Sequence, residues 1–388
     1  MKLASVFLIV VTCLINLTSC IKDAREIDHR SMIVGMGIDT VKDSGDEQLY
    51  EVTLQIPILL SGGQEGIPSG SVSEFETFSA KGAMLLDTVA EIEAMTPTVL
   101  FFGHLKVVTI SEELAREGLD KVIDFIDRLP QVANQIYLMI INDGTAEEFI
   151  TQESPLVSLP ALYLNRFFQA DQKISRTKDV KLFEYRRDAN MISKASTIPL
   201  GKIVDNKIVI EGMGVFVDHK MIGELVNIEV AISELLKGNK VSDMNYTTVI
   251  NINNREEKVA VSRGDLKAKI NFDKTTPLTV KISIKGNAEI AEVENIGTKV
   301  SNDVVNKVNL KMENEIERLV KETIKKMKAL NAEPWLIGHR LWATDPDFFA
   351  MLNWEENGWR DSVVEIDVDF EVVNTGQKGF LGKRKIGR

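Results

Sequence analysis

The fold class is decided by residues 101–129, which read "FFGHLKVVTISEELAREGLDKVIDFIDRL". The first ten residues form an apolar, β-branched run that is typical of a buried strand. Ser111 is then expected to cap one helix, with Glu113 and Glu117 near its start. Residues 135–143, "QIYLMIIND", predict a further strand. A strand, a helix and a strand in this order indicate that this half of the chain is α/β.

The residues before this stretch extend the same pattern. Residues 31–59 contain two β-rich runs separated by polar residues, as in a hairpin or meander. Residues 72–80 are predicted to form a strand and residues 83–96 a helix. Between these elements, residues 61–71 read "SGGQEGIPSGS" and predict a polar, glycine-rich loop of low complexity.

The C-terminal half is predicted to be a second α/β portion, and we place the boundary at Pro199. Residues 207–226 indicate a hairpin that turns at "DHK", and alternating strands fill residues 245–289. The longest helical pattern runs from about Gly297 to Leu330, and acids near its start give way to lysines. We expect mixed and largely antiparallel sheets flanked by helices, with this long helix packed on the chain's own sheet. A coiled-coil partner is the alternative.

The opening residues are typical of an export signal. Lys2 precedes the apolar run "LASVFLIVVTCLINL", residues 3–17. At about 1.5 Å per residue this run reaches roughly 22 Å, which is short of the bilayer core of about 30 Å. A bacterial lipobox, in which a cysteine receives diacylglycerol before cleavage, matches the residues that end this run: Leu17, Thr18, Ser19 and Cys20. An ordinary signal peptide with an accidental cysteine is the alternative.

The cysteine count agrees with lipid attachment. The chain has two cysteines, and Cys13 would leave with the signal, so Cys20 would remain alone in the exported chain. A lone cysteine cannot form an internal disulfide, and a free thiol outside the cell invites oxidation. The expected organisation is a signal peptide at 1–19, a lipid-proximal tether at 20–30, α/β domains at 31–198 and 199–374, and a basic tail at 375–388. A further division near residue 290 is left open.

The common signatures of catalysis are missing from the sequence. It contains no His-Glu-x-x-His pair, cysteine cluster, Gly-x-Ser-x-Gly or glycine-rich phosphate loop. The net charge of -11 argues against a general nucleic-acid binder, which would need a basic face. We therefore expect no enzyme, no metal site and no nucleic-acid partner, and no cofactor other than a covalent diacylglyceryl or acyl lipid, such as palmitate, on Cys20. The histidines are scattered at His29, His104, His219 and His339.

All four tryptophans fall in one segment near the C-terminus: Trp335, Trp342, Trp354 and Trp359. For any given ring the favoured interpretation is an aromatic plug in the core. The alternative is a partly exposed docking surface, because tryptophan is enriched at protein interfaces. We expect exposed residues of this segment, together with the loop at 61–71, to contact a partner. The tail after Asn374 carries five basic residues and no acid, so it would touch an anionic lipid surface if one lay beside it.

Several segments resemble a known family, in the same order along the chain. They are "CIKDAREIDHRSMIVGMGID" after the lipobox, "FFGHLKVVTISEELAREGLDKVIDFIDR", "EGMGVFVDHKMIGEL", a long helix, "WLIGHRLW", "NWEENGW" and a closing strand. Together they resemble the C subunit of spore germinant receptors, the Ger(x)C (GerAC-like) lipoprotein family. The sequence departs from the family at Ile21, where an aromatic residue is frequent, and at "AEPWLIG", where an acidic, glycine-rich version is more usual.

The resemblance implies a lipid-anchored, non-catalytic protein on the outer surface of the spore inner membrane. There it would work with integral-membrane A and B subunits to sense nutrients and trigger germination. A solute-binding lipoprotein of a transporter is the alternative. Such a protein would share the lipobox but should show two domains of regularly alternating strand and helix around a cleft. The hairpin-rich C-terminal half argues against it.

Overall fold

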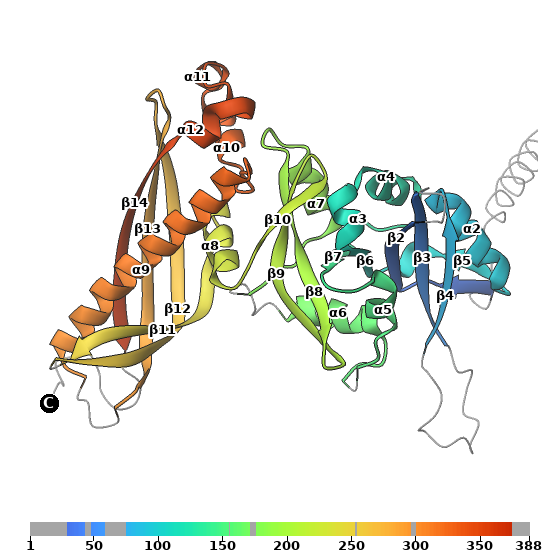
Figure 1. The fold of residues 1–388 in the computed structure, drawn as a ribbon, viewed down its shortest axis with the longest axis horizontal. Coiled ribbons are helices and arrows are strands. Elements are labelled where there is room, and N and C mark those ends of the chain that lie inside the picture. Colours follow the sequence, from blue (N-terminus) through green and yellow to red (C-terminus); the bar gives the residue numbers. More distant parts are fainter. Residues whose placement is uncertain are drawn as a thin grey trace, which may run out of the picture.

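The structure, a computed structural model, describes residues 29–42, 48–58, 75–154, 156–170, 176–252, 254–295 and 300–374. Two lobes follow one another along the long axis of the molecule (Figure 1). The N-terminal lobe is coloured blue to green and the C-terminal lobe yellow to red.

An eight-stranded sheet in the order β10-β9-β8-β7-β6-β2-β3-β4 forms the N-terminal lobe. Its central strands are mutually parallel: β2 (Gly35–Lys42), β6 (Val107–Ser111), β7 (Tyr137–Ile141) and β8 (Ala195–Val204). Antiparallel strands extend it on both sides: β3 (Gln48–Pro57), β4 (Phe75–Gly82), β9 (Lys207–Val217) and β10 (Lys220–Leu225). A separate parallel pair joins β1 (Arg30–Met32) to β5 (Val99–Phe101).

Helices cover both faces of this sheet. One core includes buried residues of α2 (Leu85–Met95), α3 (Glu112–Glu117), α4 (Asp120–Arg128) and α7 (Leu182–Ala189). On the other face lie α5 (Ala146–Thr151) and α6 (Pro160–Gln169). Every residue of β6 and β7 is buried, as expected for parallel strands between two helical layers. The predicted α/β character of this half is confirmed.

Residues 101–129 differ from the expected strand and helix in three details. The strand is interrupted, because β5 ends at Phe101 and a short 3-10 helix, Phe102–His104, precedes β6. The helix is also interrupted, because Gly118 adopts a φ of 135° between α3 and α4. Finally, the Ser111 side chain makes no capping hydrogen bond, and its hydroxyl is buried without a partner.

The C-terminal lobe contains a four-stranded sheet with one long helix. The strands, in spatial order, are β11 (Val241–Ile252), β12 (Arg255–Asp273), β13 (Thr279–Val293) and β14 (Val363–Asn374). The first three are antiparallel, whereas β14 runs parallel to β13. α9 (Asn302–Ala329) packs on this sheet through residues that include Val308, Met312 and Ile316. The predicted packing of the long helix on the chain's own sheet, and the predicted fold class, are therefore confirmed.

The change from one sheet to the other lies after β10, not at Pro199. Pro199 is inside β8, and the predicted hairpin, β9 and β10, still belongs to the N-terminal sheet. The proline coincides with a shift of register between β8 and β9, so the sequence signal marks an irregularity within the sheet. α8 (Ile228–Lys237) then connects the two lobes.

Candidate functional site at the lobe junction

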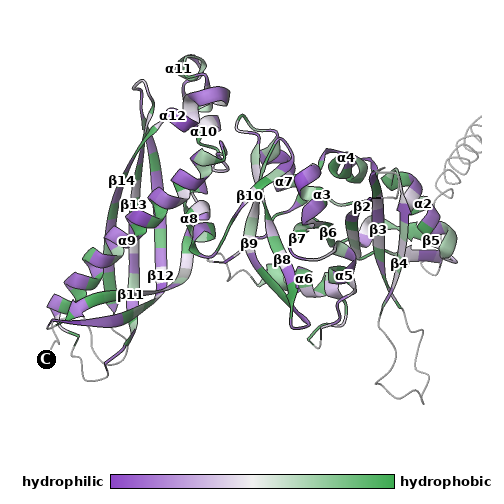
Figure 2. Cartoon of the chain, in the orientation of Figure 1, coloured by the Kyte–Doolittle hydropathy of each residue, from purple (hydrophilic) through white to green (hydrophobic). Residues whose placement is uncertain are grey.

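The tryptophans lie in a compact segment between α9 and β14. Its elements are α10 (Ile337–Thr344), α11 (Pro346–Ala350), a π-helical turn η3 (Trp354–Gly358) and α12 (Trp359–Asp361). Figure 1 places α10, α11 and α12 together at one end of the C-terminal lobe. The hydropathy colouring shows apolar and polar residues mixed through these short helices, as expected for a segment with a buried and an exposed side (Figure 2).

Three of the four tryptophans form a buried cluster. The exposed fractions of Trp335, Trp354 and Trp359 are 0%, 6% and 3%. The Trp335 and Trp359 rings meet edge to face at 5.7 Å, and the Trp354 ring lies 6.3 Å from Trp359. Two of the buried indole N–H groups donate a hydrogen bond. Trp335 donates to Ser233 Oγ at 2.9 Å, and Trp359 donates to the Ala332 carbonyl oxygen at 2.9 Å. Buried tryptophans normally satisfy their N–H in this way.

The tryptophan cluster, defined as Trp335, Trp354 and Trp359, is therefore core rather than docking surface. This agrees with the interpretation favoured for individual rings and corrects the docking assignment for these three. Trp342 differs, since it is 45% exposed and stacks beside His339 at 5.5 Å between ring centroids. Met351 in the same segment is 74% exposed. A contact between this exposed side and a partner stays a prediction.

The Glu333 carboxylate accepts hydrogen bonds from backbone N–H groups at the start of α10. Its side chain is buried, and Oε1 accepts hydrogen bonds from the backbone N–H groups of Trp335 at 2.9 Å and Ile337 at 2.8 Å. Oε2 accepts a third from Gly338 N–H at 3.0 Å. These N–H groups would otherwise lack partners at a helix start, where negative charge is also favourable. Burial raises the pKa of Glu333, and the hydrogen bonds oppose that rise.

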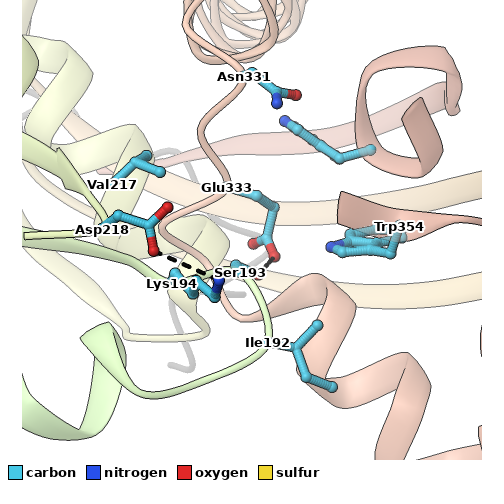
Figure 3. A pocket seen from close by; sticks show the side chains of 9 residues that line it. Ile192, Ser193, Lys194, Val217, Asp218, Asn331, Glu333 and Trp354 are labelled. Atoms are coloured by element: carbon cyan, nitrogen blue, oxygen red, sulfur yellow. Dashed lines mark hydrogen bonds and ion pairs between the residues drawn. The ribbon is translucent and has the colours of Figure 1, made fainter. Parts of the chain in front are cut away.

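The same carboxylate joins the two lobes. Ser193, in the loop before β8, donates its hydroxyl hydrogen bond to Glu333 Oε2. Figure 3 shows Glu333 pointing toward Ser193 across the junction, with Trp354 beside it. Glu333 belongs to the C-terminal lobe, and it is bound both to the start of α10 and to a loop of the N-terminal lobe. It therefore positions these two parts of the junction relative to each other. The sequence analysis missed it, although an acid shortly before a helix is a recognised signal for a helix start.

A hollow of about 220 Å³ opens beside this contact. Ser193, Lys194 and Asp218 line it from the N-terminal lobe. From the C-terminal lobe it is lined by Glu333, Trp354 and Trp359. Lys194 and Asp218 form an ion pair, with 3.6 Å between Nζ and Oδ1 (Figure 3). The Lys194 side chain is half-exposed and that of Asp218 is exposed. Within the described ranges, no group of three or more His, Cys, Asp or Glu side chains is placed to hold a metal ion.

α8 packs mainly on α9 and β12 of the C-terminal lobe and also contacts β10 of the N-terminal lobe. Seven consecutive residues from Val230 to Leu236 are buried, as expected for a helix enclosed all round. Lys237 donates to Thr197 Oγ1 at 3.0 Å, and its ammonium lies 3.8 Å from Asp188. The Arg340 guanidinium of α10 donates to the Lys237 carbonyl. The junction is thus both apolar and hydrogen-bonded, which is suited to holding the lobes in one relative orientation.

Several predicted features fall outside the described residues. They are the lipobox residues Leu17, Thr18 and Ser19, the lipidation residue Cys20, the loop 61–71 and the tail 375–388. Within the part of the chain that the structure does describe, no helix is both long and apolar enough to cross a bilayer.

Fold and junction together define a two-lobed α/β protein whose lobes meet at a buried aromatic and carboxylate contact. Residues 23–203 match the family described as spore germination protein N-terminal domain, and residues 211–376 match spore germination B3/GerAC like, C-terminal. The chain belongs to the GerAC-like family of spore germination proteins. With both halves present in order, it is a member of the germinant receptor C-subunit family.

Individual relatives agree with this assignment. Putative spore germination protein YfkR of Bacillus subtilis (strain 168) is 23% identical over 341 residues, 83% of this chain and 85% of the relative. Spore germination protein GerQC of Bacillus cereus is 21% identical over 311 residues, 79% and 84% of the two chains. Spore germination protein KC of Bacillus subtilis (strain 168) is 28% identical over 147 residues, 37% and 35%. The crystal structure of the GerBC protein matches with a TM-score of 0.52 at 18% identity, covering 87% of this chain and 97% of that chain, which supports the fold.

Proposed function

We propose that this chain is the lipid-anchored C subunit of a nutrient germinant receptor and that it helps to trigger spore germination without catalysis. The observation that carries the proposal is the match of both halves, in order, to the N-terminal and C-terminal domains of one family of spore germination proteins. In this proposal the protein lies on the outer surface of the spore inner membrane and works with integral-membrane A and B subunits.

The lipobox supplies the physical basis for the membrane location. A diacylglyceryl group on Cys20 carries two acyl chains, and each buried methylene contributes about 0.8 kcal/mol of membrane affinity. One chain alone gives only marginal binding, whereas two give stable anchoring. The residues between Cys20 and β1, "IKDAREIDH", are polar enough to form a hydrated tether. Arg30, which the predicted tether included, is the first residue of β1.

The exposed side of the tryptophan segment is the proposed contact for the partner subunits. Trp342 and Met351 present apolar surface on the C-terminal lobe, and exposed apolar surface marks interaction sites when it is concentrated. The loop 61–71, between β3 and β4 of the N-terminal lobe, is proposed to contact the partner subunits separately. A transporter's solute-binding lipoprotein is less well supported, because the C-terminal lobe has one long helix over a largely antiparallel sheet rather than alternating strands and helices.

Replacing the lipidated cysteine tests the proposal. In Cys20→Ala the lipid transfer and the cleavage that depends on it should stop, so the precursor keeps its apolar signal or is cut elsewhere. We expect weak or absent germination in response to nutrients, with normal germination by agents that bypass the receptors. Mass spectrometry of the mature N-terminus and copurification of the A and B subunits from spore membranes are the measurements. An unmodified Cys20 contradicts the anchor, and a failure to copurify contradicts the complex.

A further inference from the structure

β14 forms one edge of the C-terminal sheet, because among the described strands β13 is its single neighbour. It lies at the outer side of the C-terminal lobe (Figure 1). Successive N–H groups of a strand point to opposite edges, and those of Phe370 and Val372 point toward α9. They donate to Glu313 Oε1 at 3.3 Å and to Asn309 Oδ1 at 2.9 Å. The N–H groups at every second residue toward the start of β14 therefore also point away from β13.

The outer edge of β14 is open between two ends that contact α9. Before its start, Lys328 of α9 donates to the Ser362 carbonyl, and its end is held by the two contacts described above. The outward N–H groups between these ends belong to Val364, Ile366 and Val368, and no hydrogen-bond acceptor for them is found among the described residues. Unpaired N–H and C=O groups along an edge strand form a template for one more extended segment.

The side chains on the open face of β14 are acidic at four alternate positions. We call these residues the acidic row, and all of them are exposed: Glu365, Asp367, Asp369 and Glu371. β13 supplies lysines opposite Glu365 and Asp369 only, because the residues in register with the other two are a serine and an asparagine. A segment added at the outer edge would place its own side chains beside this row. Opposite charges across neighbouring strands are favourable, so the open edge is suited to a basic segment.

The chain itself ends in a basic segment that starts where β14 stops. The tail 375–388 lies outside the described residues, reads "TGQKGFLGKRKIGR" and contains five basic residues and no acid. The distance from the end of β14 back to Val368 is about 20 Å, at about 3.3 Å per residue, whereas the nine tail residues up to Lys383 can reach about 30 Å. Alternate residues of an extended segment face opposite sides. Consecutive Lys383, Arg384 and Lys385 therefore present at least one basic side chain to the acidic row in any register.

We propose that the outer edge of β14 between Val364 and Val368 is the docking site of the chain's own basic tail, with Lys383, Arg384 and Lys385 beside the acidic row. A second copy of β14 is a poorer occupant, because pairing two such strands would place acids opposite acids. The docked tail shields the edge from strands of other chains. The contact depends on the C-terminal lobe alone, so it does not require the lipid anchor of the proposed function.

Disulfide trapping tests the contact directly. The mature chain without Cys20 is cysteine-free, so cysteines can be introduced in chosen pairs. Asp367→Cys with Lys385→Cys joins the acidic row to the tail. Leu310→Cys with Lys385→Cys is the matched control, because Leu310 is 61% exposed on α9 and follows the residue that bonds Val372 near the end of β14. A tail that moved at random would meet position 310, near its origin, at least as often as position 367.

Under mild oxidation we expect the disulfide at position 367 to form within one chain, at least about fivefold faster than at position 310, because docking raises the effective concentration of the tail at the edge. Equal rates at the two positions overturn the proposal. A disulfide at position 367 that links two chains, in place of one within a chain, also overturns it, since the occupant of the edge is then the tail of a second copy.

Hydrogen exchange followed by mass spectrometry tests the same edge without cysteines. The chain of residues 21–388 is compared with the combined variant Lys383→Gln, Arg384→Gln and Lys385→Gln. We expect the β14 amides of the variant to exchange at least about threefold faster, because undocking removes their protection, while β11 at the other edge of the sheet exchanges as before. Unchanged exchange in β14 overturns the proposal. Faster exchange in both edge strands would show a general loss of stability and would likewise contradict docking at β14.

Discussion

The two lobes bury their sheets in different ways. In the N-terminal lobe, helices cover both faces, and β6 and β7 are buried along their whole length. In the C-terminal lobe, α9 covers one face, and β14 alternates between exposed residues and residues turned toward the helix. A sheet enclosed on both faces contains much of its own core, whereas a sheet covered on one face depends on what packs at its single covered side. The C-terminal lobe should therefore rely strongly on α9 and the tryptophan cluster.

The open face of the C-terminal sheet adds little to the stability of that lobe. Its outward residues on β14 include Glu365 and Asp369, which pair with Lys281 at 3.8 Å and Lys285 at 3.5 Å on β13. These side chains are largely exposed, and exposed ion pairs typically contribute about 0–1 kcal/mol. They keep the open face soluble, while the free energy that holds the lobe together comes from the covered side.

Removing a ring of the tryptophan cluster should lower the unfolding free energy more than any other change considered. Trp335→Ala removes a fully buried ring and leaves the Ser233 hydroxyl without its donor, so we expect unfolding free energy to fall by about 3–5 kcal/mol. Trp342→Ala, at 45% exposure, is the control and should cost less than about 1 kcal/mol. Urea unfolding followed by circular dichroism measures both. Similar small losses for the two variants would show that the C-terminal lobe does not depend on the cluster.

The next effect should come from the junction carboxylate. Glu333→Gln keeps the shape but replaces one accepting oxygen by an NH₂ group, so at least one of the N–H or O–H donors loses its partner. We expect a loss of about 1–3 kcal/mol, the cost of leaving a buried polar group unpaired. Ser193→Ala, which removes only the hydrogen bond between Ser193 and Glu333, should cost less. Glu365→Gln on the open face is the control and should be nearly neutral; a Glu333→Gln protein as stable as this control would contradict the positioning role.

The contrast between the lobes also explains what could be predicted from the sequence. Continuous apolar runs and alternating runs are local patterns, so the α/β class, the hairpin at "DHK" and the long helix could be predicted. The extent of the first sheet could not, because Pro199 looks like a boundary locally, and only long-range pairing shows that β9 and β10 continue that sheet. The same holds for the junction, where Glu333 and Ser193 are distant in sequence and meet only in the folded chain.

The smallest predicted effect returns to the N-terminal lobe, which has its own buried carboxylate at a helix start. Asp39 on β2 accepts hydrogen bonds from Ala146 N–H at 2.7 Å and Glu147 N–H at 3.0 Å, at the beginning of α5. Burial raises the pKa of Asp39 to about 6, the two N–H groups oppose that rise, and the nearby charges of Glu51 and Glu147 add to it.

Because the pKa of Asp39 is higher in the folded chain than its ordinary value of 3.8, the folded state binds this proton more tightly than the unfolded state. The contribution of Asp39 to stability therefore rises as the pH falls through about 6, and levels off below the unfolded value. As the pH is lowered from 7 to 5, this gain amounts to about 1 kcal/mol, since one pKa unit corresponds to about 1.4 kcal/mol.

Asp39→Asn cannot take up the proton and should lack this gain. As the pH is lowered from 7 to 5, the unfolding free energy of the variant should therefore fall by about 1 kcal/mol relative to that of the wild type. Urea unfolding at the two pH values measures the difference, with Glu365→Gln as the reference for a carboxylate on the open face. If Asp39→Asn follows the pH dependence of the wild type, Asp39 titrates like an exposed acid, and the enclosure of the N-terminal sheet is less complete at α5 than its buried strands indicate.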